Sequence, residues 1–117
     1  MTARASWTAG ALALALTAAG TGAAHAQDDA LFLVVRYHEA VRAAELCGDT
    51  KLTRNEQDKL AVLVGQLTRH QLPVGEELTA IREGRANLEQ RVTAHGCKDA
   101  LVVDALRFFD GFRNQLR

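Results

Sequence analysis

The sequence predicts an all-α fold, a small up-down-up-down four-helix bundle braced by one disulfide bond. Three observations predict it. Apolar residues recur at three- and four-residue spacing in four successive segments of the chain. The joins between these segments are short, as they are between antiparallel neighbours in a bundle, and the single proline, Pro73, lies in the middle join. The only two cysteines, Cys47 and Cys97, lie at the first and third joins.

Residues 1–26 have the features of a cleavable secretory signal peptide. Arg4 supplies a positive charge near the start, an apolar run rich in Ala and Leu follows, and a small-x-small motif ends at Ala26. The run is shorter than the roughly 20 residues that span a bilayer, which disfavours the alternative of a retained anchor. We therefore expect cleavage before Gln27, a single helical domain over residues 27–117, and a periplasmic or secreted protein.

Capping signals mark the ends of the expected helices. Gly48 can end the first helix in a left-handed conformation. Thr53 and Glu56 are the two ends of a capping box that starts the second helix, and Asp99 is suited to cap the fourth. The expected helices cover approximately residues 28–47, 54–70, 76–95 and 99–116. The alternative is a three-helix arrangement in which Pro73 only kinks one long helix.

Polar side chains interrupt two of the apolar stripes. His38 and Glu45 lie on the stripe of the first helix, and Arg85 lies on that of the third. We expect His38 at the edge of the core and not in a metal site. Metal sites in helical bundles usually have Glu-x-x-His or His-x-x-x-His pairs, and none occurs after the signal. His70 and His95 are expected to cap the C-termini of the second and third helices.

The topology of the bundle explains the two cysteines. The first and third joins of an antiparallel four-helix bundle lie at the same end, so Cys47 and Cys97 are brought together. In a short exported chain, two cysteines most simply form a disulfide. A redox enzyme would instead have a close C-x-x-C pair. We expect a structural Cys47–Cys97 bond that contributes about 4 kcal/mol through loop entropy.

Charge and motif content disfavour several classes of function. Acidic and basic residues balance at 14 each, which argues against binding to nucleic acid or to anionic lipid. We expect no metal and no cofactor. A calcium loop starting at Asp49 would place Lys51 at a ligand position, and the C-x-x-C-H haem motif is missing. No G-x-S-x-G motif occurs and no serine follows the signal, so an enzyme of unknown type is only the third alternative.

Two stretches are more apolar than a bundle core requires. Residues 31–35 are apolar around most of the helix circumference, and three phenylalanines crowd the end of the fourth helix. In an up-down bundle these two stretches meet at the end opposite the disulfide, together with the join at Pro73. Exposed apolar surface of this kind marks a binding site, although a well-filled core end is the alternative. The predicted partner-binding residues are Leu31, Phe32, Leu33, Val35, Phe108 and Phe112.

The sequence therefore favours an exported small helical protein that acts by non-covalent association through an apolar end formed by the first and fourth helices. It would be an accessory, inhibitor or chaperone-like binding factor. Its partner would be another exported protein or a second copy of the chain, with no nucleic acid and no stable membrane anchor after signal cleavage. The alternative is a carrier that holds a small apolar ligand in a pocket between the first and fourth helices.

Overall fold

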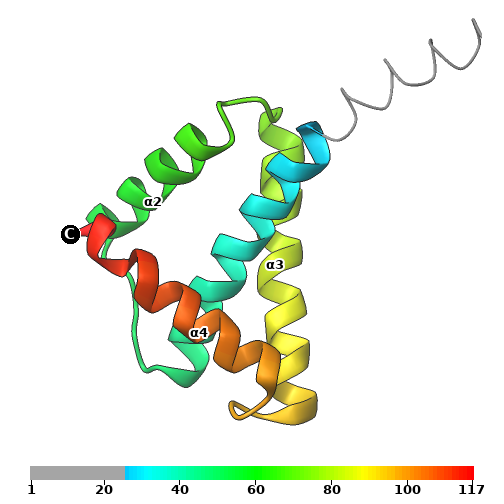
Figure 1. The fold of residues 1–117 in the computed structure, drawn as a ribbon, viewed down its shortest axis with the longest axis vertical. Coiled ribbons are helices and arrows are strands. Elements are labelled where there is room, and N and C mark those ends of the chain that lie inside the picture. The colour runs from blue at the N-terminus through cyan, green and yellow to red at the C-terminus, as the bar shows by residue number, and fades with distance from the viewer. Residues whose placement is uncertain (1–25) are drawn as a thin grey trace, which may run out of the picture.

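The computed structural model describes residues 26–117 (Figure 1). The expected signal peptide therefore lies outside the described residues, except for Ala26. The described chain forms four helices and a short 3₁₀ helix. These are an N-terminal helix over residues 26–47, α2 (Arg54–Leu67), α3 (Val74–His95), α4 (Ala100–Phe112) and η1 (Arg113–Leu116). The all-α four-helix fold is confirmed, and α2 and α3 are separate helices. Over this range, we find no helix with the length and apolar character needed to cross a membrane.

The capping signals act as the sequence predicts. The hydroxyl of Thr53 accepts a hydrogen bond from the Glu56 amide at 3.2 Å, and the Glu56 carboxylate accepts one from the Thr53 amide at 3.0 Å. These bonds to the ionised form lower the pKa of Glu56. The Asp99 carboxylate likewise accepts from the amides of Leu101 and Val102 at the start of α4.

The end of α2 differs from the prediction. The helix stops at Leu67, three residues before the expected end at His70, because Arg69 and His70 both adopt left-handed backbone conformations, with φ of 56° and 52°. This turn folds the His70 ring back over Gly65, where an added Cβ would lie 2.8 Å from a ring carbon. The absence of a side chain at Gly65 therefore leaves room for the His70 ring.

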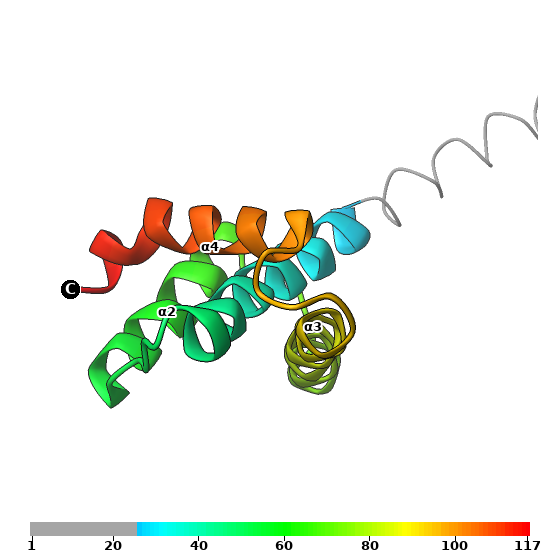
Figure 2. The ribbon, with the colours of Figure 1, turned by 90° about the horizontal axis from the view of Figure 1, so that it is seen from below.

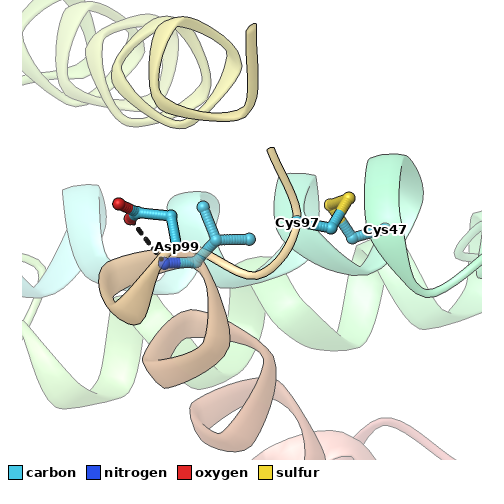
Figure 3. The surroundings of a disulfide bond; sticks show 4 residues. Cys47, Cys97 and Asp99 are labelled. Atoms are coloured by element: carbon cyan, nitrogen blue, oxygen red, sulfur yellow. Dashed lines mark hydrogen bonds between the residues drawn. A yellow bond between two sulfur atoms is a disulfide. The ribbon is translucent and has the colours of Figure 1, made fainter. Parts of the chain in front are cut away.

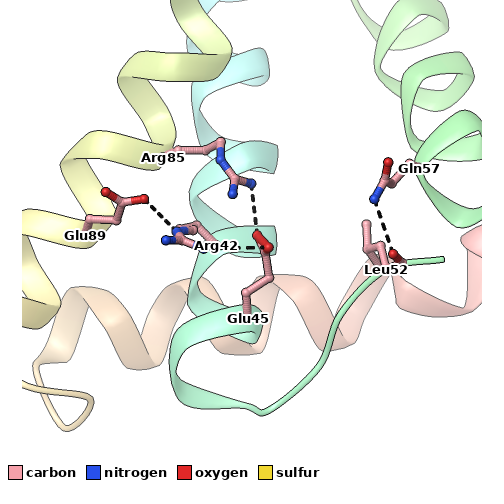
Figure 4. Close-up of polar contacts among 6 residues, drawn as sticks. All are labelled: Arg42, Glu45, Leu52, Gln57, Arg85 and Glu89. Atoms are coloured by element: carbon pink, nitrogen blue, oxygen red, sulfur yellow. Dashed lines mark hydrogen bonds and ion pairs between the residues drawn. The ribbon is translucent and has the colours of Figure 1, made fainter. Parts of the chain in front are cut away.

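The N-terminal helix and α3 lie side by side and run parallel, with a very close backbone approach (Figure 1). A Cβ added at Gly84 of α3 would lie only 2.7 Å from the carbonyl oxygen of Val35. Ion pairs flank this contact, since Arg42 donates to Glu89 at 2.7 Å and Arg85 donates to Glu45 at 2.9 Å. Figure 4 shows these four side chains lying between the two helices.

The fourth helix leans across the N-terminal helix. Figure 1 shows α4 ending beside the start of α2, and Figure 2, with α3 seen end-on, shows α4 lying across the direction of α3. The following 3₁₀ helix, η1, packs on α2. The expectation that the end of the fourth helix meets the start of the first is therefore wrong. The apolar stripe of α4 continues into the fully buried Leu116, which joins the core that contains Leu60 and Val64 of α2.

The predicted disulfide is confirmed. Cys47, at the end of the N-terminal helix, is bonded to Cys97 in the join between α3 and α4, with the two Cα atoms 5.7 Å apart (Figure 3). Cys47 packs against a small apolar cluster that includes Ala43, Leu88 and Val102, one from each of the three elements that meet here. The bond thus fixes the entry to α4 against the other two helices.

Candidate functional site

The six residues predicted to bind a partner lie in different environments. Phe32 is 62% exposed, whereas Phe112 is buried at 3% exposure. Leu31, Leu33, Val35 and Phe108 are partly buried and pack against the main core. Phe112 therefore cannot offer its ring to a partner on the surface of this fold.

Phe108 and Phe112 belong to an aromatic cluster around Tyr37. The ring of Tyr37 lies 4.9 Å from that of Phe108 and 4.7 Å from that of Phe112, centroid to centroid. The guanidinium of Arg36 stacks over Phe108 at 4.4 Å and also pairs with Asp104 at 3.7 Å. The crossing of α4 over the N-terminal helix places these rings at the middle of that helix. The structure does not bring them together with the exposed ring of Phe32.

The start of the N-terminal helix instead meets the join between α2 and α3. Gln27 donates to Glu76 at 2.6 Å, and a groove of about 470 Å³ separates the two helix starts. Its apolar lining includes Leu31, Val35 and Pro73. The meeting of the first helix with the Pro73 join, as the sequence predicts, is confirmed.

Large exposed apolar side chains occur at this same end of the molecule. Val74, the first residue of α3, is 73% exposed, and Phe32 is the next most exposed of the large apolar residues in the described chain. Leu67, the last residue of α2, and Leu78, in the second turn of α3, are also exposed. We call the following set the apolar end: Leu31, Phe32, Val35, Leu67, Pro73, Val74 and Leu78.

A second groove, of about 490 Å³, lies among the N-terminal helix, α3 and α4. This is where an apolar-ligand pocket between the first and fourth helices is expected, but charged side chains line much of it. Arg36, Glu39, Arg91 and Asp104 all contribute to its walls. Burial raises the pKa of Glu39, against the opposing effect of Arg36 and Arg91.

A third cleft, of about 310 Å³, lies on the other side of the helix pair, facing α2. His38 and Glu45 reach it from the N-terminal helix, and Arg85 reaches it from α3. Burial, with a smaller contribution from Arg85, lowers the pKa of His38 to about 4, so the imidazole is neutral at neutral pH. The polar residues that interrupt the two apolar stripes in the sequence are therefore those that meet in this cleft, and that pattern is the signal that could have revealed it.

The shifted pKa of His38 predicts a specific acid sensitivity. As the pH falls from about 6.5 to 4, the unfolded chain takes up a proton on His38 while the folded protein does not. The free energy of unfolding should therefore fall by up to about 3 kcal/mol over this interval, and not further below it. His38→Gln should remove this part of the loss in urea unfolding curves recorded from pH 7 to pH 4. Parallel pH profiles for the variant and the wild type would contradict the assignment.

Neither a metal site in the described residues nor a similar protein indicates a function. Within residues 26–117, no cluster of three His, Cys, Asp or Glu side chains could hold a metal ion. Comparisons with family models, curated proteins and solved structures find no match for this chain. The described residues therefore form a small all-α domain braced by one disulfide bond.

Proposed function

We propose that this protein acts by non-covalent association with another protein through the apolar end. One observation supports this proposal above the others. Phe32 and Val74 are the two most exposed large apolar residues of the described chain, and each is the sequence neighbour of an apolar residue that lines the groove, Leu31 or Pro73. Single exposed apolar residues are ordinary, but a group of them beside a groove is typical of a protein-binding surface.

The proposed setting is the periplasm or the extracellular space. The Cys47–Cys97 bond supports it, because structural disulfides persist in oxidising compartments and are rare in the cytosol. The signal-like features of residues 1–26 point the same way. An accessory, inhibitor or chaperone-like binding factor acting on another exported protein fits this setting.

Charge substitutions test the proposal directly. Phe32→Asp and Val74→Asp place a carboxylate on the surface that a partner would cover, and burying it would cost several kcal/mol. Each substitution should weaken association by at least about 100-fold, as read by native mass spectrometry of the exported protein. Both side chains are exposed, so the helical content and the midpoint of unfolding should stay close to those of the wild type.

Leu101→Asp is the matched control. Leu101 is an apolar residue with 55% exposure at the start of α4, near the disulfide and away from the apolar end. Its substitution should leave association unchanged. A loss of association equal to that of Phe32→Asp, or full association by Phe32→Asp and Val74→Asp, would contradict the proposed surface.

The alternative function, a carrier that holds a small apolar ligand between the first and fourth helices, has less support. The groove bordered by the N-terminal helix, α3 and α4 is lined by both arginines and carboxylates, and Arg36 covers the one aromatic ring that faces it. Such walls favour a charged ligand over an apolar one.

A further inference from the structure

The cleft on the α2 side of the helix pair is lined by both apolar and charged side chains. Its apolar lining includes Leu60 and Val64 from α2, Val41 from the N-terminal helix and Ile81 from α3. Leu52, in the join before α2, closes one edge, and the side chain of Gln57 is held there by a hydrogen bond to the Leu52 carbonyl at 3.3 Å. Figure 4 shows Gln57 and Leu52 on one side and Arg85 and Glu45 on the other.

The charged lining residues are of both signs. Arg85 and Lys51 are the cations, and Glu45 and Glu77 are the carboxylates. Arg85 uses Nη1 to donate to Glu45, which leaves other N–H groups of the guanidinium to serve a ligand. Glu45 is already shared between Arg85 and Arg42, so it is the less available of the two carboxylates.

His38 also lines the cleft and adds a neutral donor and acceptor. Because its ring is uncharged at neutral pH, it does not disturb the balance between two cations and two carboxylates. The volume of about 310 Å³ is at the small end of the usual range for ligand pockets, about 300–1,000 Å³. The cleft therefore suits a small molecule that carries both charges and an apolar body.

We propose that this cleft binds a zwitterionic molecule with apolar side chains, of the chemical class of an apolar amino acid or dipeptide. The carboxylate of the ligand would lie against Arg85 and Lys51, and its ammonium group against Glu77. Its apolar side chains would lie along Leu60 and Ile81. This inference is independent of the apolar end, since the two surfaces share no residue.

Leucyl-leucine is the probe, and two blocked forms of it test the charge requirement. We expect leucyl-leucine to shift the NMR signals of His38, Leu60 and Ile81, and to bind at millimolar concentration or below. Amidation of the C-terminus removes the charge that Arg85 and Lys51 attract, and acetylation of the N-terminus removes the one that Glu77 attracts. Each blocked form should bind at least about 10-fold more weakly, which corresponds to 1.4 kcal/mol.

Two substitutions test the site from the side of the protein. Lys51→Gln breaks no ion pair found in the described chain and should weaken binding at least fivefold, and Arg85→Gln should weaken it further. Arg82→Gln is the control, because Arg82 lies one turn from Arg85 on the exposed side of α3 and does not line the cleft. The inference is overturned if leucyl-leucine causes no shifts at 10 mM, if either blocked form binds as tightly as leucyl-leucine, or if Arg82→Gln weakens binding as much as Lys51→Gln.

Discussion

Replacing both cysteines, in the Cys47→Ser/Cys97→Ser variant, is expected to lower the free energy of unfolding by about 4 kcal/mol. The bond joins residues 50 positions apart, and opening so long a loop restores much conformational freedom to the unfolded chain. The loss is large against the roughly 5–10 kcal/mol that stabilises a domain of this size.

The structure also indicates which part of the protein should lose stability first in this variant. The start of α4 is held by the bond and by the small apolar cluster around Leu88 and Val102, whereas the end of α4 and η1 lie in the larger core. Amides near the start of α4 should therefore exchange faster with solvent in the variant than amides near Phe112.

Denaturation in urea measures the total loss of stability, and the reduced wild type should match the double variant. A loss below about 1 kcal/mol would show that the unfolded chain gains little freedom from opening the loop.

Gly84→Ala is expected to be the most damaging glycine-to-alanine substitution within residues 26–117, with a loss of about 2–3 kcal/mol. The added carbon would lie 2.7 Å from the Val35 carbonyl oxygen and 3.2 Å from the Val35 Cα. Both are backbone atoms of the neighbouring helix, so the clash is relieved only by moving the helices apart. That movement would also lengthen the ion pairs Arg42–Glu89 and Arg85–Glu45 that flank the contact.

Gly111→Ala is the matched control for the effect of alanine on a helix. Gly111 lies within α4, and a Cβ there would meet nothing within 4 Å. Since alanine is favoured over glycine inside a helix by up to about 1 kcal/mol, this variant should be as stable as the wild type or more so. Thermal and urea unfolding of both variants measure the contrast. Equal effects of the two substitutions would contradict a close backbone contact at Gly84.

Local signals in the sequence predicted the elements well, because helix ends depend on nearby residues. The capping box at Thr53 and the cap at Asp99 depend on side chains within three residues of the amides that they satisfy. The Cys47–Cys97 pairing also followed, because any antiparallel arrangement brings the first and third joins together.

The direction of α4 could not be predicted in this way. Apolar periodicity shows which face of a helix is buried, but the crossing angle depends on how particular side chains interlock. The crossing of α4 buries Phe112 against Tyr37 and separates it from Phe32. The binding surface that the sequence predicted between the first and fourth helices therefore does not form. The proposed surface combines Phe32 with Val74, which lies at the turn between α2 and α3.

The most direct test of the proposed association is site-specific photo-crosslinking in the cell that exports the protein. A photoreactive phenylalanine analogue at position 32 would lie on the apolar end, and the same analogue at position 101 would serve as the control. The proposal predicts a protein adduct from position 32 and none from position 101. The mass of the adduct would identify the partner as a second copy or as another protein. An absence of adducts at position 32, or equal adducts at both positions, would contradict the proposal.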